Sequence, residues 1–370
     1  MKLFHIIFVV TASIVSISAV PTSKKFDPIT FINAPINVPI FSTGGSNPDY
    51  FAEIEVSKQK FNVCLDTGSV NLWLPHPSCR DTTCTKTKSF DFTKSTTFST
   101  NNEPFLEVYG GGNVSGIVAT DNISMGGLTS QGQIFGLALH QTNGLDDSKY
   151  DGIMGMSAGR INITKSIDAV PLFNSLVQQG VVEEPMFSFY FGRKDGTHGQ
   201  LTLGGYDSSL FEGSLQFNTL IGNNTGVWLI ALEDVSVNGT PLNFKNKIAI
   251  LDTGAPYIYA SNVDAKAVHS SIDGAVKHQG AHPLVPCNTT AVVSLQFAGI
   301  NYNITLAGEP VKGSDGLCLS GVSGSGGQLS KHGSNPNVWI VGVPFLKNVY
   351  AAFDIVNSRV GFALPKTQAV

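Results

Sequence analysis

The tripeptide Asp-Thr-Gly occurs twice in the chain, at residues 66–68 and again at residues 252–254. Each copy follows an apolar run and precedes another, as expected for a turn that leaves one buried strand and enters the next. Two carboxyl groups held close together cannot both ionise readily, so one keeps its proton while the other is charged. Such a pair supplies a base and an acid to one reaction and can activate water against a carbonyl group. We therefore expect Asp66 and Asp252 to be catalytic.

The simplest alternative is that the two aspartates are ordinary turn residues. A second repeated element argues against it, because YDGIMGM at 150–156 is echoed by VWIVGVP at 338–344. Each of these elements follows its Asp-Thr-Gly at almost the same distance along the chain. Two echoes in the same order predict an internal duplication into two similar β lobes. An approximate two-fold axis between such lobes would bring both aspartates to one interface.

The residues beside the aspartates suit such an interface. Gly68 and Gly254 have no Cβ, so the chain can turn tightly and its backbone can approach the opposite carboxyl group. Thr67 and Thr253 can form hydrogen bonds across to the opposite loop and hold the pair in register. Ser69 can donate its hydroxyl to the first aspartate and favour its ionised form.

The elements that must position these residues are predicted to be strands. Short runs of alternating apolar and polar residues, bounded by glycine-rich turns, include FAEIEVS, KFNVCLD, FLEVYG, FSFYFG and GQLTLGG. Helical periodicity is scarce, and we expect two short helices in PLFNSLVQQG and NVDAKAVHSSI. The pattern indicates an all-β protein.

Composition narrows the possible functions. The 370 residues are 42% hydrophobic and 14% charged, which favours a large folded core over a disordered chain. The net charge of −4 and the lack of a Lys/Arg block argue against nucleic acid as a partner. The 8 histidines show no metal-binding spacing, and we expect neither a metal nor another cofactor.

The N-terminus indicates export. Residues 1–19 combine Lys2, an apolar stretch too short to span a membrane, and small residues suited to cleavage, which is typical of a signal peptide. Residues 20–38 form a leader or a short pro-segment. Lys24 or Lys25 either pairs with the two catalytic aspartates, hereafter the dyad, and holds them inactive, or the two lysines mark a processing site. We expect a protein that is secreted or in the lumen of the secretory pathway and has no membrane association.

Export changes the interpretation of the five cysteines. In an oxidising compartment, Cys79 with Cys84 and Cys287 with Cys318 predict two local disulfides. Cys64 is left over within an apolar run, and we expect a buried, inert thiol. The sequence also offers seven candidate glycosylation sites: Asn113, Asn122, Asn162, Asn223, Asn238, Asn288 and Asn303.

Taken together, these motifs resemble the pepsin-like aspartic protease family over nearly all of the chain after about residue 40. DTGSVNLWLP and DTGA resemble that family's two active-site loops, and residues 204–217 and 339–363 resemble its inter-lobe and C-terminal segments. The resemblance implies a bilobal double β-barrel with a few short helices and a cleft, with lobes at 39–207 and 208–370. It also matches the two cysteine pairs to two family disulfides.

The resemblance implies a secreted, monomeric aspartic endopeptidase, made as a zymogen. It would cut extended polypeptides between bulky apolar residues, and pepstatin-like or proteinaceous inhibitors would bind it. It further implies three groups of supporting residues: a flap at Tyr109, Gly110 and Gly111, a tryptophan bonded to that tyrosine at Trp73, and an apolar pocket at Tyr150 and Ile153.

Some positions depart from the family pattern. Ala255 replaces a Thr or Ser, which should raise the pKa values of the dyad and favour activity at a milder pH. Val343 replaces an Asp, which should act in the opposite direction. Gly111 loosens the flap and Asn113 places a candidate glycan on it, while Pro256 alters the edge of the second loop. The alternative function is a non-catalytic binding or inhibitor protein on the same fold.

Overall fold

The structure is a computed structural model that describes residues 34–46, 48–142, 149–159, 169–192, 199–222, 226–276, 282–324 and 335–366. The expected signal peptide at 1–19 lies outside these residues, as does the leader before residue 34. Strands dominate the described residues, which confirms the prediction of an all-β protein. Their helices are short: α1 (Leu172–Gln178), α2 (Asn262–Ser270) and α3 (Val343–Leu346), with single 3-10 turns at Cys84–Lys86, Phe92–Lys94 and Ser208–Leu210.

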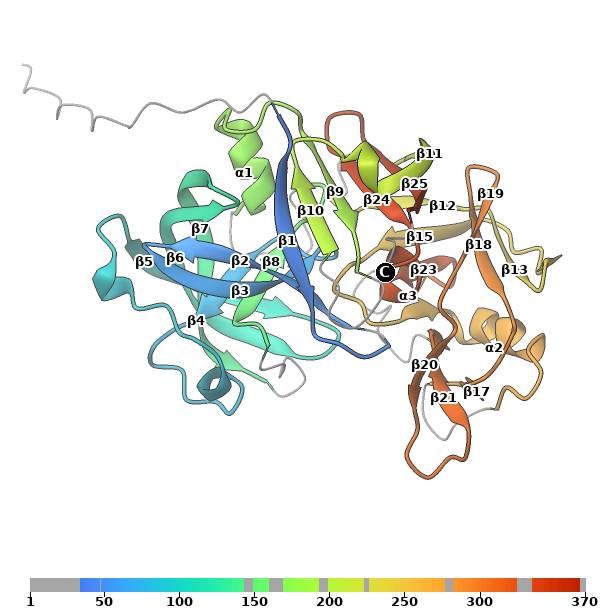
Figure 1. Cartoon of the computed structure of the whole chain (residues 1–370). Helices are drawn as coiled ribbons and strands as arrows, with labels where there is room; N and C mark the ends of the chain where they lie inside the picture. Colours follow the sequence, from blue (N-terminus) through green and yellow to red (C-terminus); the bar gives the residue numbers. More distant parts are fainter. Residues whose placement is uncertain are drawn as a thin grey trace, which may run out of the picture. The chain divides into compact units, whose positions relative to one another are not determined.

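Six strands of the N-terminal half close into a ring in the order β2, β3, β8, β4, β7, β6 and back to β2 (Figure 1). Their side chains alternate, as in β2, where the inward positions are buried and most of the outward ones are exposed. β5 (Ser99–Val108) pairs with β6 outside the ring. The ring strands are β2 (Tyr50–Val56), β3 (Gln59–Asp66), β4 (Leu72–Pro75), β6 (Asn113–Met125), β7 (Leu128–Gln141) and β8 (Gly152–Gly155).

The C-terminal half contains three smaller sheets. The five-stranded sheet has the order β12 (Leu229–Leu232), β15 (Lys247–Leu251), β23 (Val338–Val341), β16 (Ile258–Ala260), β22 (Val322–Gly324). The four-stranded sheet is β14 (Thr240–Pro241), β13 (Asp234–Val237), β18 (Val293–Phe297), β19 (Ile300–Asn303). The three-stranded sheet is β17 (Leu284–Pro286), β21 (Leu317–Ser320), β20 (Ala307–Pro310).

The two halves share a run of six strands, in which β9 pairs with β24 (Figure 1). The first of these strands in chain order, β1, begins at residue 36 and so includes residues 36–38, the end of the expected leader. Within it, Ile36 pairs with Leu203 and Val38 pairs with Leu201. The run has the order β11 (Phe211–Thr219), β25 (Arg359–Pro365), β24 (Tyr350–Asp354), β9 (Met186–Tyr190), β10 (Gly199–Leu203), β1 (Ile36–Ser42).

The repeated sequence elements occupy equivalent places in the two halves. In the first half β3 runs parallel to β8, with Leu65 opposite Met154. In the second half β15 runs parallel to β23, with Leu251 opposite Val341. Antiparallel partners complete each set, β4 on β8 and β16 on β23. Each aspartate therefore lies at the end of a strand whose parallel neighbour is the second repeated element of the same half, in β8 or in β23.

The core runs continuously between the halves. Phe187 stacks on Phe353 with ring centroids 5.0 Å apart, and Trp228 meets Phe353 edge-on at the same centroid distance. The Trp228 side chain is fully buried and donates from Nε1 to the carbonyl oxygen of Met156 at 2.9 Å. Truncating an aromatic side chain in such a core costs about 3–5 kcal/mol. This packing fixes the end of β8, which lies beside the first Asp-Thr-Gly loop.

Both predicted helices are present. In α1, Leu172 and Leu176 are buried, and the helix is followed by Gly180 in the left-handed conformation, with φ of 69°. In α2, the hydroxyl of Ser261 accepts a hydrogen bond from the backbone of Asp264, which caps the first turn. Among the residues described, no helix is long and apolar enough to cross a membrane.

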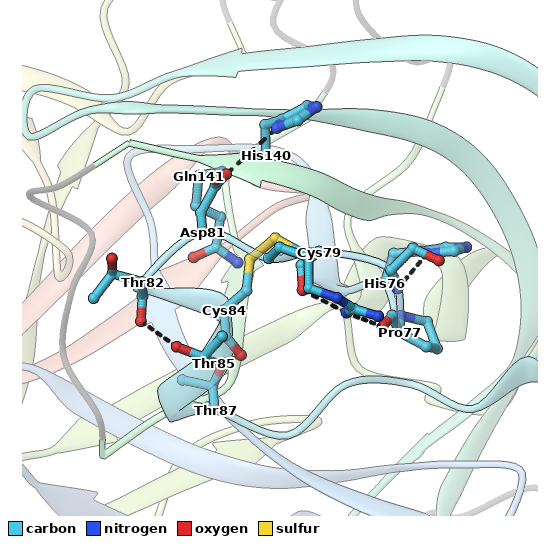
Figure 2. Close-up of a disulfide and its surroundings, with 12 residues drawn as sticks. His76, Pro77, Cys79, Asp81, Thr82, Cys84, Thr85, Thr87, His140 and Gln141 are labelled. Carbon is cyan, nitrogen blue, oxygen red and sulfur yellow. Dashed lines mark hydrogen bonds and ion pairs between the residues drawn. A yellow bond between two sulfur atoms is a disulfide. The ribbon is translucent and has the colours of Figure 1, made fainter.

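The disulfide between Cys79 and Cys84 closes a loop against β7 (Figure 2), with the two Cα atoms 5.9 Å apart. Asp81 within this loop accepts a hydrogen bond from the Gln141 backbone at 2.9 Å, and His140 lies 3.4 Å from the same carboxyl oxygen. The loop is therefore fixed to the end of β7 by a covalent bond and by polar contacts.

The second disulfide joins Cys287 to Cys318, whose Cα atoms are 4.9 Å apart. Both predicted pairings are thus present. Cys64 lies in β3 with only 3% of its surface exposed, in agreement with the expectation of a buried thiol.

Candidate active site

The two Asp-Thr-Gly turns leave equivalent strands with the same local geometry. Asp66 is the last residue of β3, and Asp252 directly follows β15. The backbone of Ser69 donates to the Asp66 carbonyl at 3.4 Å, and the backbone of Ala255 donates to the Asp252 carbonyl at 3.3 Å. The two loops therefore repeat each other in structure as well as in sequence. Ala255 occupies the position in the second loop that Ser69 occupies in the first.

The two threonines interlock the loops. The backbone N–H of each donates to the Oγ1 of the other at 3.0 Å. The Thr67 hydroxyl then donates to the carbonyl of Leu251 at 2.8 Å, and the Thr253 hydroxyl donates to the carbonyl of Leu65 at 2.6 Å. Neither threonine has any exposed surface. Four buried hydrogen bonds thus hold one loop in register with the other.

Each glycine of the motif lies against the carboxyl group of the opposite half. A Cβ built at Gly68 would lie 2.5 Å from Cγ of Asp252, and one built at Gly254 would lie 2.8 Å from Cγ of Asp66. Real side chains do not approach so closely, so any residue larger than glycine would push the carboxyl groups away. The two carboxyl groups therefore meet where the loops cross.

The loop residues that can donate to the two carboxyl groups differ at one position. Asp66 accepts from the backbone of Gly68 at 2.8 Å and from the hydroxyl of Ser69 at 2.5 Å. Asp252 accepts the matching backbone bond from Gly254 at 2.9 Å, but Ala255 has no hydroxyl to donate. The two loops therefore share the backbone hydrogen bond and differ at one position, where Ser69 has a hydroxyl and Ala255 has none.

A hairpin stands beside the first loop. β5 and β6 are joined by a tight turn in which the backbone of Tyr109 donates to the carbonyl of Gly112 at 2.7 Å, with exposed Gly110 and Gly111 at its tip. Trp73 donates from Nε1 to the Tyr109 hydroxyl at 2.9 Å. Burial, followed by the charges of Glu107 and Asp66, raises the pKa of Tyr109 well above its usual value. The phenol therefore stays neutral.

An apolar cluster lies beneath this hairpin. Ile153 pairs with Trp73 between β8 and β4, and Tyr150 packs against the same cluster while its hydroxyl donates to Asp49 at 3.4 Å. The expected pocket residues and the hairpin tyrosine thus belong to one cluster. Its buried members are Cys64, Trp73, Phe105, Val114, Val118, Ala138 and Ile153.

A second apolar cluster lies beside Asp252, and sequence reasoning missed it. It contains Ala255 and Ile340 with Tyr259 packed against it. Tyr259 pairs with Ile340 as Trp73 pairs with Ile153, so the internal echo was the signal that could have revealed it. Burial, followed by the charges of Tyr257 and Asp252, raises the pKa of Tyr259.

Tyr259 also belongs to a small aromatic group next to this second cluster. The rings of Tyr257 and His282 lie 4.6 Å apart between centroids, and Tyr257 and Tyr259 lie 6.0 Å apart. Burial lowers the pKa of His282. Among the described residues, no cluster of three His, Cys, Asp or Glu side chains could hold a metal ion.

Comparison with known proteins decides the family. The family model described as "Eukaryotic aspartyl protease" matches residues 49–365. The chain belongs to the eukaryotic aspartyl protease family. It is similar to the aspartic-type endopeptidase ctsD of Aspergillus fumigatus, with 33% identity over 332 residues, 88% of this chain and 68% of that protein.

Animal relatives of this aspartyl protease are equally similar. Cathepsin E of Aquarana catesbeiana is 32% identical over 324 residues, which cover 85% of this chain and 79% of the relative. Cathepsin D of Gallus gallus is 33% identical over 328 residues, 85% of this chain and 80% of the relative. Family and relatives together identify the protein as an aspartic-type endopeptidase, a hydrolase.

The candidate glycosylation sites of the aspartyl protease lie mostly on its surface. Asn122 is half-buried, and its side-chain Oδ1 accepts a hydrogen bond from the Gly132 backbone. Asn162 and Asn223 lie outside the described residues. The exposed candidates are Asn113, Asn238, Asn288 and Asn303.

Proposed function

We propose that this protein is a secreted aspartic endopeptidase that hydrolyses peptide bonds in extended polypeptides with a water activated by Asp66 and Asp252. The observation that carries the proposal is the reciprocal contact of Gly68 with the carboxyl group of Asp252 and of Gly254 with that of Asp66. This arrangement of the two loops would present both carboxyl groups to one water.

The two carboxyl groups share one proton, as is general for aspartic protease dyads. Because Ser69 directs its hydroxyl at Asp66, we assign the charge to Asp66 and the shared proton to Asp252. Asp66 takes a proton from the bound water as the hydroxide oxygen attacks the peptide carbon. Asp252 donates its proton toward the carbonyl oxygen, where negative charge develops. When the intermediate collapses, the proton on Asp66 passes to the leaving nitrogen and the C–N bond breaks. One hydroxyl of the intermediate returns its proton to Asp252 as the new carboxyl group forms.

The hairpin that carries Tyr109 is proposed to be a flap over the substrate. Its glycine-rich tip allows it to move, and its closure would exclude water and orient the peptide. The Trp73 Nε1 contact sets the position of the Tyr109 hydroxyl at the base of the flap. An extended peptide would bind through its backbone, with alternate side chains directed to pockets.

The two apolar clusters beside the aspartates support a preference for bulky apolar residues on either side of the cut bond. One cluster contains Ile153 and Trp73, and the other contains Ile340 with Tyr259 packed against it. Fully burying a Leu or Phe side chain contributes about 1.5–3 kcal/mol. Burying such substrate side chains on both sides would therefore supply much of the binding free energy that holds the scissile peptide bond beside the dyad.

Export is proposed from the N-terminal sequence and the disulfides. Residues 1–19 would be removed as a signal peptide, and the segment that follows would be cut during activation. Two disulfides suit an oxidising compartment, either outside the cell or within the secretory pathway. We propose a monomer with polypeptide substrates, which pepstatin-like or proteinaceous inhibitors can block.

The experiment is to express the full chain with its N-terminus, collect the processed protein and assay a peptide library from acid to neutral pH. We expect cleavage between bulky apolar residues that a statine-type transition-state analogue blocks. A correctly folded and processed protein that binds peptides without cutting them would support the non-catalytic alternative instead.

A further inference from the structure

Glu107 is a charged residue on the buried side of a flap strand. Along β5 the exposed Leu106 and Val108 alternate with the buried Phe105 and Glu107. Glu107 is only 5% exposed, although its strand neighbours on the same side belong to an apolar cluster. Burying an ionised carboxylate in such surroundings is costly, whereas the neutral acid is tolerated.

Asn71 completes a polar pair with Glu107. Its Nδ2 donates to Oε1 of Glu107, and its side chain is 2% exposed. Its Oδ1 is buried and finds no hydrogen-bond donor within the part of the chain that the structure describes. An unsatisfied buried acceptor is unfavourable, and a protonated carboxyl group has one O–H to donate. A protonated Glu107 can therefore give Asn71 Oδ1 the donor it lacks and close a cyclic acid–amide pair.

The titratable groups that face Glu107 favour its neutral form. Asp66 and Glu107 both raise the pKa of the Tyr109 phenol, so each carboxyl group lies within electrostatic range of that phenol. Opposite Glu107, β6 carries the apolar Val114. If Asp66 holds the dyad's negative charge, a second charge at Glu107 would be repelled by it.

The pair ties the flap to the first active-site loop. Asn71 and Trp73 lie two residues apart beyond Asp66, and Glu107 and Tyr109 lie two residues apart on the flap. The Asn71–Glu107 contact therefore runs beside the Trp73–Tyr109 contact.

We propose that Glu107 is a proton-carrying positioning residue, whose neutral carboxyl group pairs with Asn71 and holds the flap over the dyad. Loss of its proton turns a donor into a charge that faces the Asn71 carbonyl oxygen, and the flap loosens. This inference rests on the proposed endopeptidase function. It makes the loss of activity at higher pH a property of the flap rather than of the dyad alone.

The test compares Glu107→Gln with wild type in pH profiles of kcat/KM on one peptide. An amide has the shape of the protonated acid and keeps a donor at every pH. We expect the alkaline limb to move upward by about one pH unit, while the acid limb, which the dyad sets, stays in place. Glu103→Gln, an exposed carboxylate on the same strand, is the matched control and should leave both limbs unchanged. Superimposable profiles of Glu107→Gln and wild type would overturn the proposal.

A second readout needs no turnover. In the Asp66→Asn, Asp252→Asn double variant, the dyad holds no carboxyl group, and we expect an infrared carboxylic-acid band to persist near neutral pH. The other buried carboxylates, Asp121, Asp151, Asp264 and Asp354, each accept a hydrogen bond from an N–H group, so the band is assigned to Glu107 by its loss when Glu107→Gln is added to the double variant. Absence of the band would contradict a neutral Glu107. If wild type cleaves nothing at any pH, the endopeptidase function fails, and the infrared result still decides the state of Glu107.

Discussion

The backbone N–H of Thr67 donates to Oγ1 of Thr253 at 3.0 Å, and the backbone N–H of Thr253 donates to Oγ1 of Thr67 at the same distance. The two hydroxyls then bond to carbonyl groups of the opposite strands. Neither half can shift relative to the other at this point without breaking several buried hydrogen bonds together. The alignment of Asp66 with Asp252 thus depends on residues that do not react.

Thr67→Val tests this dependence. The substitution keeps the shape but removes the hydroxyl that serves Thr253 N and Leu251 O, so two buried groups lose a partner. We expect a loss of about 1–3 kcal/mol in the free energy of unfolding, measured by denaturant titration, and a reduced kcat.

The matched control is Thr202→Val, which removes a buried hydroxyl that bonds to Asn37 away from the dyad. It should lower stability while leaving kcat unchanged. A Thr67→Val protein with full kcat would show that the interlock is only a stabilising feature.

Gly68→Ala tests the close approach of the loops. Its Cβ would lie 2.5 Å from Cγ of Asp252, so the carboxyl group must move. We expect kcat/KM to fall by about 10²-fold in a protein that remains folded, because small displacements at a reacting centre are expensive. Gly159→Ala is the control, since its Cβ would meet nothing closer than 4.0 Å. Equal activity in both variants would refute the proposed dyad geometry.

Ala255→Thr tests the working pH. A hydroxyl at this position could donate to Asp252 as Ser69 does to Asp66, and hydrogen bonds to a carboxylate favour its charged form. We expect the acid limb of the kcat/KM profile to move to lower pH. Ala255→Val adds the same volume without a donor and should not move it. If the threonine variant keeps the wild-type profile, the alanine does not set the working pH.

His269 links stability to acid. Burial lowers its pKa below the usual 6.5, and its Nε2 lies 2.8 Å from the Ser320 hydroxyl while Nδ1 lies 2.6 Å from the Ala265 carbonyl. Because the unfolded chain binds this proton more tightly, stability is present above pH 6.5 and is lost as the pH falls through the folded-state pKa. We expect His269→Gln to flatten the pH dependence of the unfolding free energy over that window. An unchanged slope in His269→Gln would contradict the account.

Local sequence patterns predict the parts of this protein that local chemistry determines. The strands, the two helices and both disulfides follow from alternation, capping residues and cysteine spacing. The internal echo predicts two similar β lobes, and in the structure the two Asp-Thr-Gly strands have equivalent parallel partners.

Contacts between distant segments could not be predicted in the same way. The run of strands shared by the two halves joins β1 to β10 and β9 to β24, and no local pattern specifies those partners. The Asn71–Glu107 pair is similar, because a glutamate in an alternating strand looks solvent-facing until the neighbouring loop is placed. Burial in three dimensions, rather than residue type, gives Glu107 its proposed role.

The central claim is that Asp66 and Asp252 together carry the hydrolysis. The most direct measurement is kcat/KM of wild type, Asp66→Asn and Asp252→Asn on one fluorogenic peptide, at the pH of highest wild-type activity, with folding checked by circular dichroism. Each asparagine keeps the shape but removes the acid–base function, so we predict that each variant loses at least ~10³-fold of the wild-type value. Either variant within about tenfold of wild type would contradict the claim, because a shared-proton mechanism needs both carboxyl groups.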